Sequence, residues 1–319
     1  MDYVHAQPLS AKITASGPHN QLQSPLFGTL FPELRNLVFI NALTEYGDPT
    51  RRYSKHSWNY RPGYEYEREI ATNLLLTCRL IYLETHLAPV AQNEHVFWMY
   101  RPPPGPFVSD PEGYFQRMTL QQRAAIQRVR FFTQMYWLES RIAPDRAVSS
   151  AKSWNAVQPW TEGLSVPKLS ITIRHSDWWH WETGNPLRMA EPHESNGWGS
   201  WVGSVPGLQE LELEMESIDA KSEELEQLVR AALKWKFPLA HGGCLVHDGK
   251  QPTKSVWLGT STLEPRGVTA VPKSVLGRPK FDPEAEARYD TKYPIALKLH
   301  VRKIHFKVAE ARISYAVPH

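Results

Sequence analysis

The sequence predicts an α/β (α+β) fold: two N-terminal helices packed on an irregular sheet layer of at least five strands with flanking helices. Apolar residues recur at helical spacing before residue 90 and at alternate positions in several later segments. The 26 prolines and 12 tryptophans favour short elements joined by stiff, irregular loops. We expect a disordered tail over residues 1–23 and a helical segment with the first strand over 24–100. A sheet region over 101–319 is expected to be continuous with that segment.

Composition restricts the classes of function. A hydrophobic share of 41% is that of a globular protein, and a chain of 319 residues buries enough surface to fold without disulfides. The net charge of +3 is too small to indicate nucleic acid by itself. Only Cys78 and Cys244 are present and no Asn-x-Ser/Thr acceptor occurs, which fits a reducing interior. No secretory signal opens the chain, and no apolar run reaches the ~20 residues of a membrane helix. We expect an intracellular protein of the cytoplasm or nucleus, with no membrane, nucleic acid, cofactor or metal.

A first helix is expected from Pro32, because proline is favoured at the first helical position and Glu33 complements the positive end of the helix dipole. Gly47-Asp48-Pro49 is expected to end the helical run. The apolar residues at helical spacing are Leu34, Leu37, Val38 and Ala42.

A second helix is expected from about Glu67 to Leu87, after a polar, aromatic loop over residues 50–66. Apolar residues lie on two of its faces, which is typical of a buried helix. Pro89 is expected to stop it, because a proline disfavours helical backbone in the residue before it. A short strand over residues 95–100 follows.

Alternation of apolar and polar residues predicts strands later in the chain. Residues 168–174 and 210–216 alternate strictly, which predicts half-buried strands. Another strand, over residues 129–137, is expected after a short helix that Thr119 and Gln122 open as a capping box.

The last strong element, residues 295–308, changes parity. Its apolar residues occupy odd positions up to Val301 and even positions from Ile304. We expect a bulge or turn near Arg302-Lys303 that keeps both sets on the buried face. An amphipathic helix over about residues 225–232 is expected earlier in the chain.

A short repeat precedes the two clearest strands. Ser165-Val166-Pro167-Lys168-Leu169 and Ser204-Val205-Pro206-Gly207-Leu208 share the pattern S-V-P-x-L. Two similar strand entries suggest repeated β units on one sheet, as in an irregular leucine-rich-repeat-like layer.

Two blocks in the first hundred residues resemble the opening of fungal F-box-like proteins, a group whose members are largely uncharacterised. The first is Leu30-Phe31-Pro32-Glu33-Leu34-Arg35, similar to the L-P-P-E-[IL]-R start of that group, with Phe31 where a proline is usual. The second matches L-L-x-[TV]-C-R-x-I-Y-x-E at Leu75, Leu76, Thr77, Cys78, Arg79, Ile81, Tyr82 and Glu84. Asn93 and Phe97 approximate the N…F that leads into the first strand, so the resemblance covers about Ser24 to Tyr100.

This resemblance implies a non-enzymatic protein-interaction module, an F-box-like substrate receptor of a cullin–RING ubiquitin ligase. The first helix would then present an apolar face to the adaptor subunit through Leu30, Pro32, Leu34, Leu37 and Val38. The other interpretation is that these side chains pack on the second helix as ordinary core. Two further alternatives remain: a structural or ligand-binding domain without a ligase link, and a cysteine-dependent enzyme that uses Cys244.

The region from His241 to Asp248 contains the residue types of a Cys-His-Asp site. Cys244 would be the nucleophile, with His241 or His247 as its base. Closeness in sequence does not place a base within hydrogen-bonding reach, so we favour a glycine turn at Gly242-Gly243 that flanks a buried cysteine. His175, Asp177 and His180 could supply three metal ligands, but their spacing matches no established set of ligands. We therefore favour a strand end with polar loop residues at this position.

A tryptophan-rich span runs from Trp178 to Trp201. Tryptophan is enriched where partners bind, and Trp179 and Trp198 are the candidate anchors. The alternative is a cluster that folds back under a long loop.

Charge is patterned in two late segments. Residues 210–226 are rich in acids, and residues 292–307 are rich in lysine, arginine and histidine. We expect the acidic and basic strands to lie side by side and pair on a solvated sheet face, rather than to form a nucleic-acid groove.

Overall fold

The computed structural model describes residues 13, 17–105, 108–141, 161–181, 185–192, 197–260, 281–292 and 297–309. Most of the predicted tail, and Ile295 of the last predicted strand, lie outside the described residues. The helical elements are α2 (Pro25–Gly28), α3 (Pro32–Ala42), η1 (Thr72–Leu76), α4 (Arg79–Thr85), α5 (Ala88–Gln92), α6 (Pro111–Gln116), α7 (Leu120–Ala125), η2 (Trp137–Arg141), α8 (Trp198–Gly203), η5 (Asp219–Lys221), α9 (Ser222–Ala232) and α11 (Pro283–Lys292). The strands are β1 (Tyr46–Arg52), β2 (Tyr66–Glu69), β3 (Glu94–Trp98), β4 (Arg128–Phe132), β5 (Lys168–Ile173), β6 (Glu210–Ile218), β7 (Lys236–Pro238), β8 (Cys244–His247), β9 (Thr253–Gly259) and β10 (Leu297–Val308).

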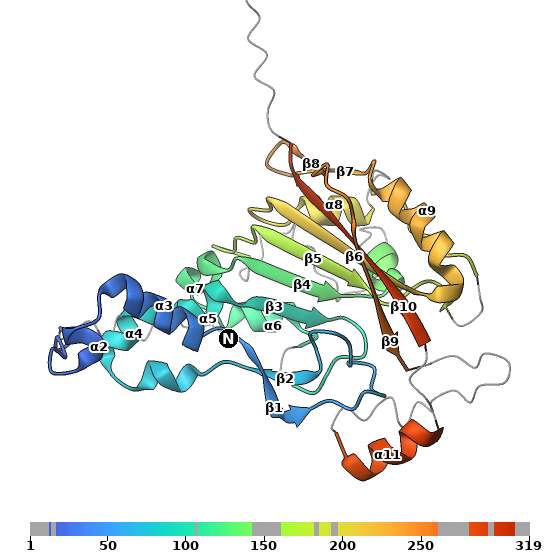
Figure 1. The fold of residues 1–319 in the computed structure, drawn as a ribbon. Coiled ribbons are helices and arrows are strands. Elements are labelled where there is room, and N and C mark those ends of the chain that lie inside the picture. Colours follow the sequence, from blue (N-terminus) through green and yellow to red (C-terminus); the bar gives the residue numbers. More distant parts are fainter. Residues whose placement is uncertain are drawn as a thin grey trace, which may run out of the picture.

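The predicted α/β class is confirmed. One mixed sheet of eight strands has the order β3-β4-β5-β6-β10-β8-β7, and β9 also pairs with β10 (Figure 1). The first four strands are parallel, and β10 runs antiparallel to β6, β8 and β9. A separate antiparallel pair, β1 and β2, lies close to the β3 end of the sheet, and α2, α3 and α4 extend from that side (Figure 1).

One face of the sheet carries the main hydrophobic core. In β5 and β6 its members are Leu169, Ile171 and Ile173, which pair in register with Leu211, Leu213 and Met215. The amphipathic helix α9 covers this face with Leu225, Val229 and Ala232, all buried, so the helix predicted over residues 225–232 is confirmed.

The opposite face, which we call the charged face, is lined by Glu94, Arg130, Glu212, Glu214, Glu216 and Lys303. It is also buried, because the segment between β1 and β2 lies over it and contributes Arg61, which is 6% exposed. Helix α11 holds this segment: the Glu286 carboxylate accepts hydrogen bonds from the Ser54 hydroxyl at 2.8 Å and the Lys55 amide at 2.9 Å. The prediction that β5 and β6 are half-buried is therefore wrong. Ser170 and Thr172, on this second face, are 0% exposed.

Burial on both faces also explains the parity change in β10. The pairing of β10 with β6 runs without a shift from Leu299↔Ile218 to Lys307↔Glu210, so the predicted bulge near Arg302-Lys303 is wrong. Leu299 and Val301 are buried on the charged face, and Ile304 and Phe306 are buried on the main core face. One regular strand thus contributes apolar residues to two separate layers.

The predicted second helix, residues 67–87, is also wrong as one element. Its first residues form β2, which pairs with β1 over Gly47↔Arg68, and the loop predicted over residues 50–66 begins inside β1. The Thr77 hydroxyl donates to the Leu74 carbonyl at 2.7 Å, and Cys78 is extended (φ −158°, ψ 161°), so η1 and α4 are separate. Pro89 does not end a helix; it lies in the first turn of α5, where its missing N–H removes no helical hydrogen bond.

Several local predictions are confirmed. Thr119 caps α7 and Gln122 closes the capping box, which leads into β4. The strand predicted over residues 129–137 is shorter than expected, because β4 ends at Phe132 and Trp137 begins η2. The strand predicted at residues 95–100 is β3. The two S-V-P segments lie side by side, since the Val166 amide donates to the Pro206 carbonyl at 2.7 Å. The leucine-rich-repeat-like detail is not confirmed, because β6 is followed in the sheet by the antiparallel β10.

Candidate protein-docking surface

Helix α3 carries apolar residues on two sides, and only one side is buried. Phe39 (2% exposed) and Leu43 (0% exposed), four residues apart, pack inward. Pro32 begins the helix as predicted, with Phe31 extended just before it. The sequence signal for this buried side was the four-residue spacing of Phe39 and Leu43, which competes with the stripe of Leu34, Leu37 and Val38.

The other side, which we call the outward face of α3, consists of Phe31 (71% exposed), Leu34 (49%), Leu37 (55%) and Val38 (50%). At 100° per residue Leu34, Leu37 and Val38 fall within one third of the helix circumference, and Phe31 is extended just before the helix begins. Pro32 is exposed beside them, whereas Leu30 is partly buried. The interpretation that Leu34, Leu37 and Val38 pack on the second helix as core is therefore wrong, because each keeps about half of its surface exposed.

An ion pair joins the two blocks that carry the sequence resemblance. Arg35 of α3 donates from Nε and Nη2 to the two carboxylate oxygens of Glu84 in α4, both at 2.9 Å. The Arg35 side chain is 11% exposed, and its guanidinium lies 4.9 Å from the ring centroid of Phe27. A two-bond guanidinium–carboxylate contact fixes orientation as well as distance, so α3 is held rigidly against α4.

Asn93 fixes the end of the same unit. Its side-chain amide donates to the carbonyl oxygens of Leu43 at 2.9 Å and Pro89 at 2.8 Å, and its carbonyl oxygen accepts from the Glu45 amide at 2.6 Å. Asn93 thus satisfies backbone groups after α3 and in α5 at once. The outward face of α3 is presented by a helix that is fixed at both ends.

Trp198 cannot act as a partner anchor, and that prediction is wrong. It is 1% exposed, donates from Nε1 to the Ala190 carbonyl at 2.9 Å, and packs edge-on against Trp235 and Phe237. Trp179 is partly buried and donates from Nε1 to the Glu139 carboxylate. The tryptophans of this span fold back, as the alternative predicted, but onto the main hydrophobic core rather than as a separate cluster under a loop.

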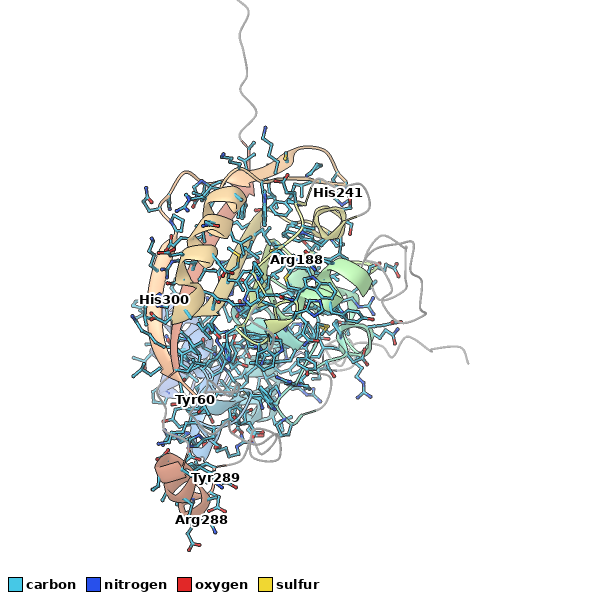
Figure 2. The ribbon with its side chains drawn as sticks, turned by 90° about the vertical axis from the view of Figure 1, so that its right-hand side faces the viewer. Tyr60, Arg188, His241, Arg288, Tyr289 and His300 are labelled. Atoms are coloured by element: carbon cyan, nitrogen blue, oxygen red, sulfur yellow. The ribbon has the colours of Figure 1, made fainter. Side chains whose placement is uncertain are left out.

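The segment around Cys244 forms a tight hairpin. Gly242 (φ +89°) and Gly243 (φ +86°) make the turn between β7 and β8, and the Leu239 amide donates to the Gly243 carbonyl at 3.1 Å. Figure 2 shows His241 at the upper end of the molecule, far from Arg288 and Tyr289 of α11. Cys244 and His247 are three residues apart in β8, so their side chains point to opposite faces of the strand. The Cys244 thiol, which is only partly buried and not buried as predicted, donates to the Leu245 carbonyl at 3.5 Å rather than to His241 or His247.

His175, Asp177 and His180 do not converge. The Asp177 carboxylate is bound by the Arg174 guanidinium at 2.7 Å, and His175 donates from Nδ1 to Glu216 at 2.8 Å. No cluster of three or more metal-ligating side chains occurs within the described ranges of the chain.

The acidic and basic strands pair as predicted, but not on a solvated face. β6 and β10 place Lys303 opposite Glu214 (2.7 Å) and Lys307 opposite Glu210 (2.9 Å). Glu214 also contacts Arg61, and it is 3% exposed. The predicted solvated face is wrong because the segment between β1 and β2 covers it.

Burial and pairing act in opposite directions on these carboxylates. Burial alone would raise the pKa of Glu216, but Arg61 and the two hydrogen bonds from His175 outweigh it and lower the pKa to about 2. In the same way burial would raise the pKa of Glu212, and Arg130 holds it below its ordinary value. Trp257 donates to Glu216 at 3.1 Å and Arg130 to Glu212 at 2.8 Å, so both carboxylates are satisfied within the chain.

Comparison with known proteins gave no match among family models, curated proteins or solved structures. Among the helices of the described residues, none combines the length and the apolar character that crossing a membrane requires.

Proposed function

We propose that this chain is a non-enzymatic protein-interaction module, an F-box-like substrate receptor that docks a cullin–RING ligase adaptor through the outward face of α3. The observation that carries the proposal is the outward face itself. Three large apolar side chains on one side of α3, and Phe31 just before it, are each about half or more exposed, while the helix has a separate buried side. Apolar patches of this kind mark sites where proteins interact.

The rigidity of α3 also supports docking. The Arg35–Glu84 pair and the Asn93 hydrogen bonds hold the helix in place, so the outward face needs no ordering when a partner arrives. A preformed surface loses less conformational entropy on association than a mobile one. The resemblance of the same two blocks to F-box-like proteins supplies the identity of the partner.

The test is isothermal titration calorimetry, in which the purified adaptor subunit is titrated into the purified protein. The parent is expected to bind, and the variant Leu34→Asp, Leu37→Asp is expected not to bind, because two carboxylates would be desolvated against an apolar partner surface. The matched control is Val256→Asp, Leu258→Asp on β9, which alters two similarly exposed apolar residues elsewhere. This control is expected to bind as the parent does.

Two results would contradict the proposal in different ways. If the parent does not bind the adaptor, the ligase link is wrong. If both double variants bind as the parent does, the adaptor binds, but not through α3. Sedimentation of the parent and of the α3 variant shows whether a second copy of the chain covers the outward face instead, since only the parent would then form a dimer.

A further inference from the structure

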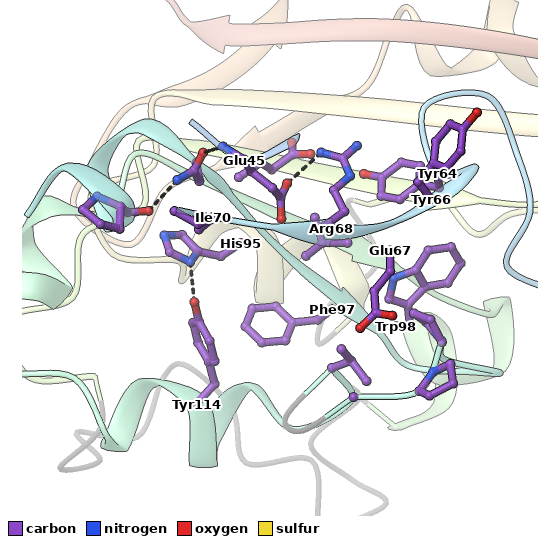
Figure 3. A pocket seen from close by; sticks show the side chains of 18 of the residues that line it. Glu45, Tyr64, Tyr66, Glu67, Arg68, Ile70, His95, Phe97, Trp98 and Tyr114 are labelled. Atoms are coloured by element: carbon purple, nitrogen blue, oxygen red, sulfur yellow. Dashed lines mark hydrogen bonds and ion pairs between the residues drawn. The ribbon is translucent and has the colours of Figure 1, made fainter. Parts of the chain in front are cut away.

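A pocket of about 390 Å³ opens beside the free edge of β3 (Figure 3). Its volume falls in the range of about 300–1,000 Å³ that is typical of ligand pockets. The walls come from β2, from β3, from the proline-rich segment after β3 and from α6. Several of the lining side chains are aromatic, among them Tyr64, Tyr66, Phe97, Trp98 and Tyr114.

The backbone of β3 faces this pocket with hydrogen-bonding groups. The Met99 amide donates to the Phe132 carbonyl at 2.8 Å, which continues the parallel ladder between β3 and β4. Because backbone groups alternate sides along a strand, His95 and Phe97 also bond toward β4, and Val96 points its N–H and C=O away from β4. Val96 lines the pocket, and β3 has no strand neighbour on this side among the described strands.

The chain itself already uses the neighbouring position on the same edge. The Trp98 amide, which points to the same side as the Val96 amide, donates to the Val108 carbonyl at 2.7 Å. An extended segment can therefore approach this edge of β3. The contact with Val108 occupies only the end of the strand, and the Val96 groups remain directed into the pocket.

The aromatic walls are fixed before any ligand enters. His95 uses both ring nitrogens: Nε2 donates to the Val90 carbonyl at 2.9 Å, so Nδ1 accepts from the Tyr114 hydroxyl at 2.8 Å (Figure 3). Burial lowers the pKa of His95 and raises that of Tyr114 to about 12, so both stay neutral. Tyr64 packs edge-on against Trp98, with ring centroids 5.7 Å apart.

The side of the pocket formed by β2 carries an excess of negative charge. Glu67 extends from β2 into the pocket (Figure 3). Its carboxylate shares the single guanidinium of Arg51 with Asp48 and Glu69. Arg68, the cation that lines the pocket, is paired with Glu45 at 2.6 Å. Because Arg51 is shared among three carboxylates, Glu67 is only partly neutralised where it lines the pocket.

We propose that this pocket binds an extended segment of a partner protein that carries a lysine or arginine side chain. The segment pairs with the free edge of β3 through the Val96 N–H and C=O, as in recognition by strand addition. The aliphatic stem of its basic residue lies along the aromatic walls, and the cationic end reaches the Glu67 carboxylate. This site is separate from the outward face of α3 and does not depend on the adaptor.

The first probe is a fluorescently labelled pentapeptide in which valine and threonine alternate around a central lysine. Its anisotropy is measured on titration with the full chain, beside the same peptide with a central glutamate. The lysine peptide is expected to bind with a saturable curve and at least fivefold more tightly than the glutamate peptide. Equal affinities for the two peptides, or no binding of the lysine peptide, would overturn the proposal.

Two pairs of variants separate the charge from the strand pairing. Glu67→Gln is expected to weaken binding of the lysine peptide about fivefold or more. Its control, Glu69→Gln, removes a carboxylate that shares Arg51 but does not line the pocket, and is expected to bind within twofold of the parent. Val96→Pro removes the outward amide at an edge position where proline is tolerated, and Val96→Thr keeps that amide. Binding is expected to be lost only in the proline variant.

Amide hydrogen exchange tests the pairing in the unmodified protein, so the proposal remains testable if Val96→Pro does not fold. Saturating lysine peptide is expected to slow exchange at Val96 and to leave Phe97, already bonded toward β4, unchanged. Peptide binding without protection of Val96 would overturn the strand pairing. Binding of n-butylammonium as tight as that of the peptide would show a cation pocket without strand pairing, and it too would overturn the proposal.

Discussion

The outward face of α3 and the charged face of the sheet depart from the usual distribution of side chains in opposite ways. On α3, leucine and valine side chains are exposed; in the sheet, Glu214 and Glu216 are 3% and 1% exposed. Both glutamates have their partners within the chain: Arg61 and Lys303 contact Glu214, and His175 and Trp257 contact Glu216. The exposed apolar side chains have no such cover among the described residues. The charged face is therefore a structural feature, whereas the outward face of α3 is the surface that we propose for docking.

The largest effect is expected from Arg61→Ala. This change leaves Glu214 and Glu216 buried without their shared guanidinium, and breaking such a pair on one side costs about 3–5 kcal/mol. The free energy of unfolding is measured by urea denaturation. Lys307→Ala, which removes an exposed pair with Glu210, serves as the control and is expected to have no measurable effect. Similar losses in the two variants would contradict the structural role of the charged face.

A second effect depends on pH. The pKa of Glu216 falls from 4.5 in the unfolded chain to about 2 in the folded one, so its ionised form stabilises the fold above pH ~4.5. That contribution, about 3 kcal/mol, is lost as the pH falls from about 5 to 2. We expect Glu216→Gln to show a shallower loss of stability over this range than the parent. Identical pH profiles would mean that Glu216 is not held ionised.

A smaller effect is expected at the contact between the two sequence blocks. Arg35→Lys keeps the positive charge but cannot make both hydrogen bonds to Glu84, so we expect a loss of about 1 kcal/mol in the free energy of unfolding. Glu84→Gln should cost a similar amount, and the double variant should cost less than the sum of the two. Additive losses would show that the two side chains do not interact in solution.

The sequence predicted most elements that depend on a single periodicity. The start of α3, the capping box at Thr119, β5, β6 and α9 all follow from local spacing. The predictions failed where long-range contacts decide the outcome. Alternation in β6 indicated one polar face, but it could not show that Arg61, 153 residues away from Glu214, covers that face. The parity change in β10 needed no bulge, because both faces of the sheet are buried.

Among the candidate sites, too, local features were predictable from the sequence and long-range contacts were not. The turn at Gly242-Gly243 was predictable because turns are local. The burial of Trp198 was not, because it depends on Trp235 and Phe237 from a later segment. The pocket beside β3 left no motif at all: its walls are brought together from β2, β3 and α6, and its free backbone groups become visible only once the strand order is known.

The most direct test of the central claim is the free energy of unfolding of two variants of one helix. Phe39→Ala alters the buried side of α3 and is expected to cost about 3–5 kcal/mol. Leu34→Asp, Leu37→Asp alters the outward face and is expected to cost about 1 kcal/mol or less, the difference in helix propensity. A loss of several kcal/mol in the second variant would contradict the account, because it would show that the outward face of α3 is covered by the chain itself.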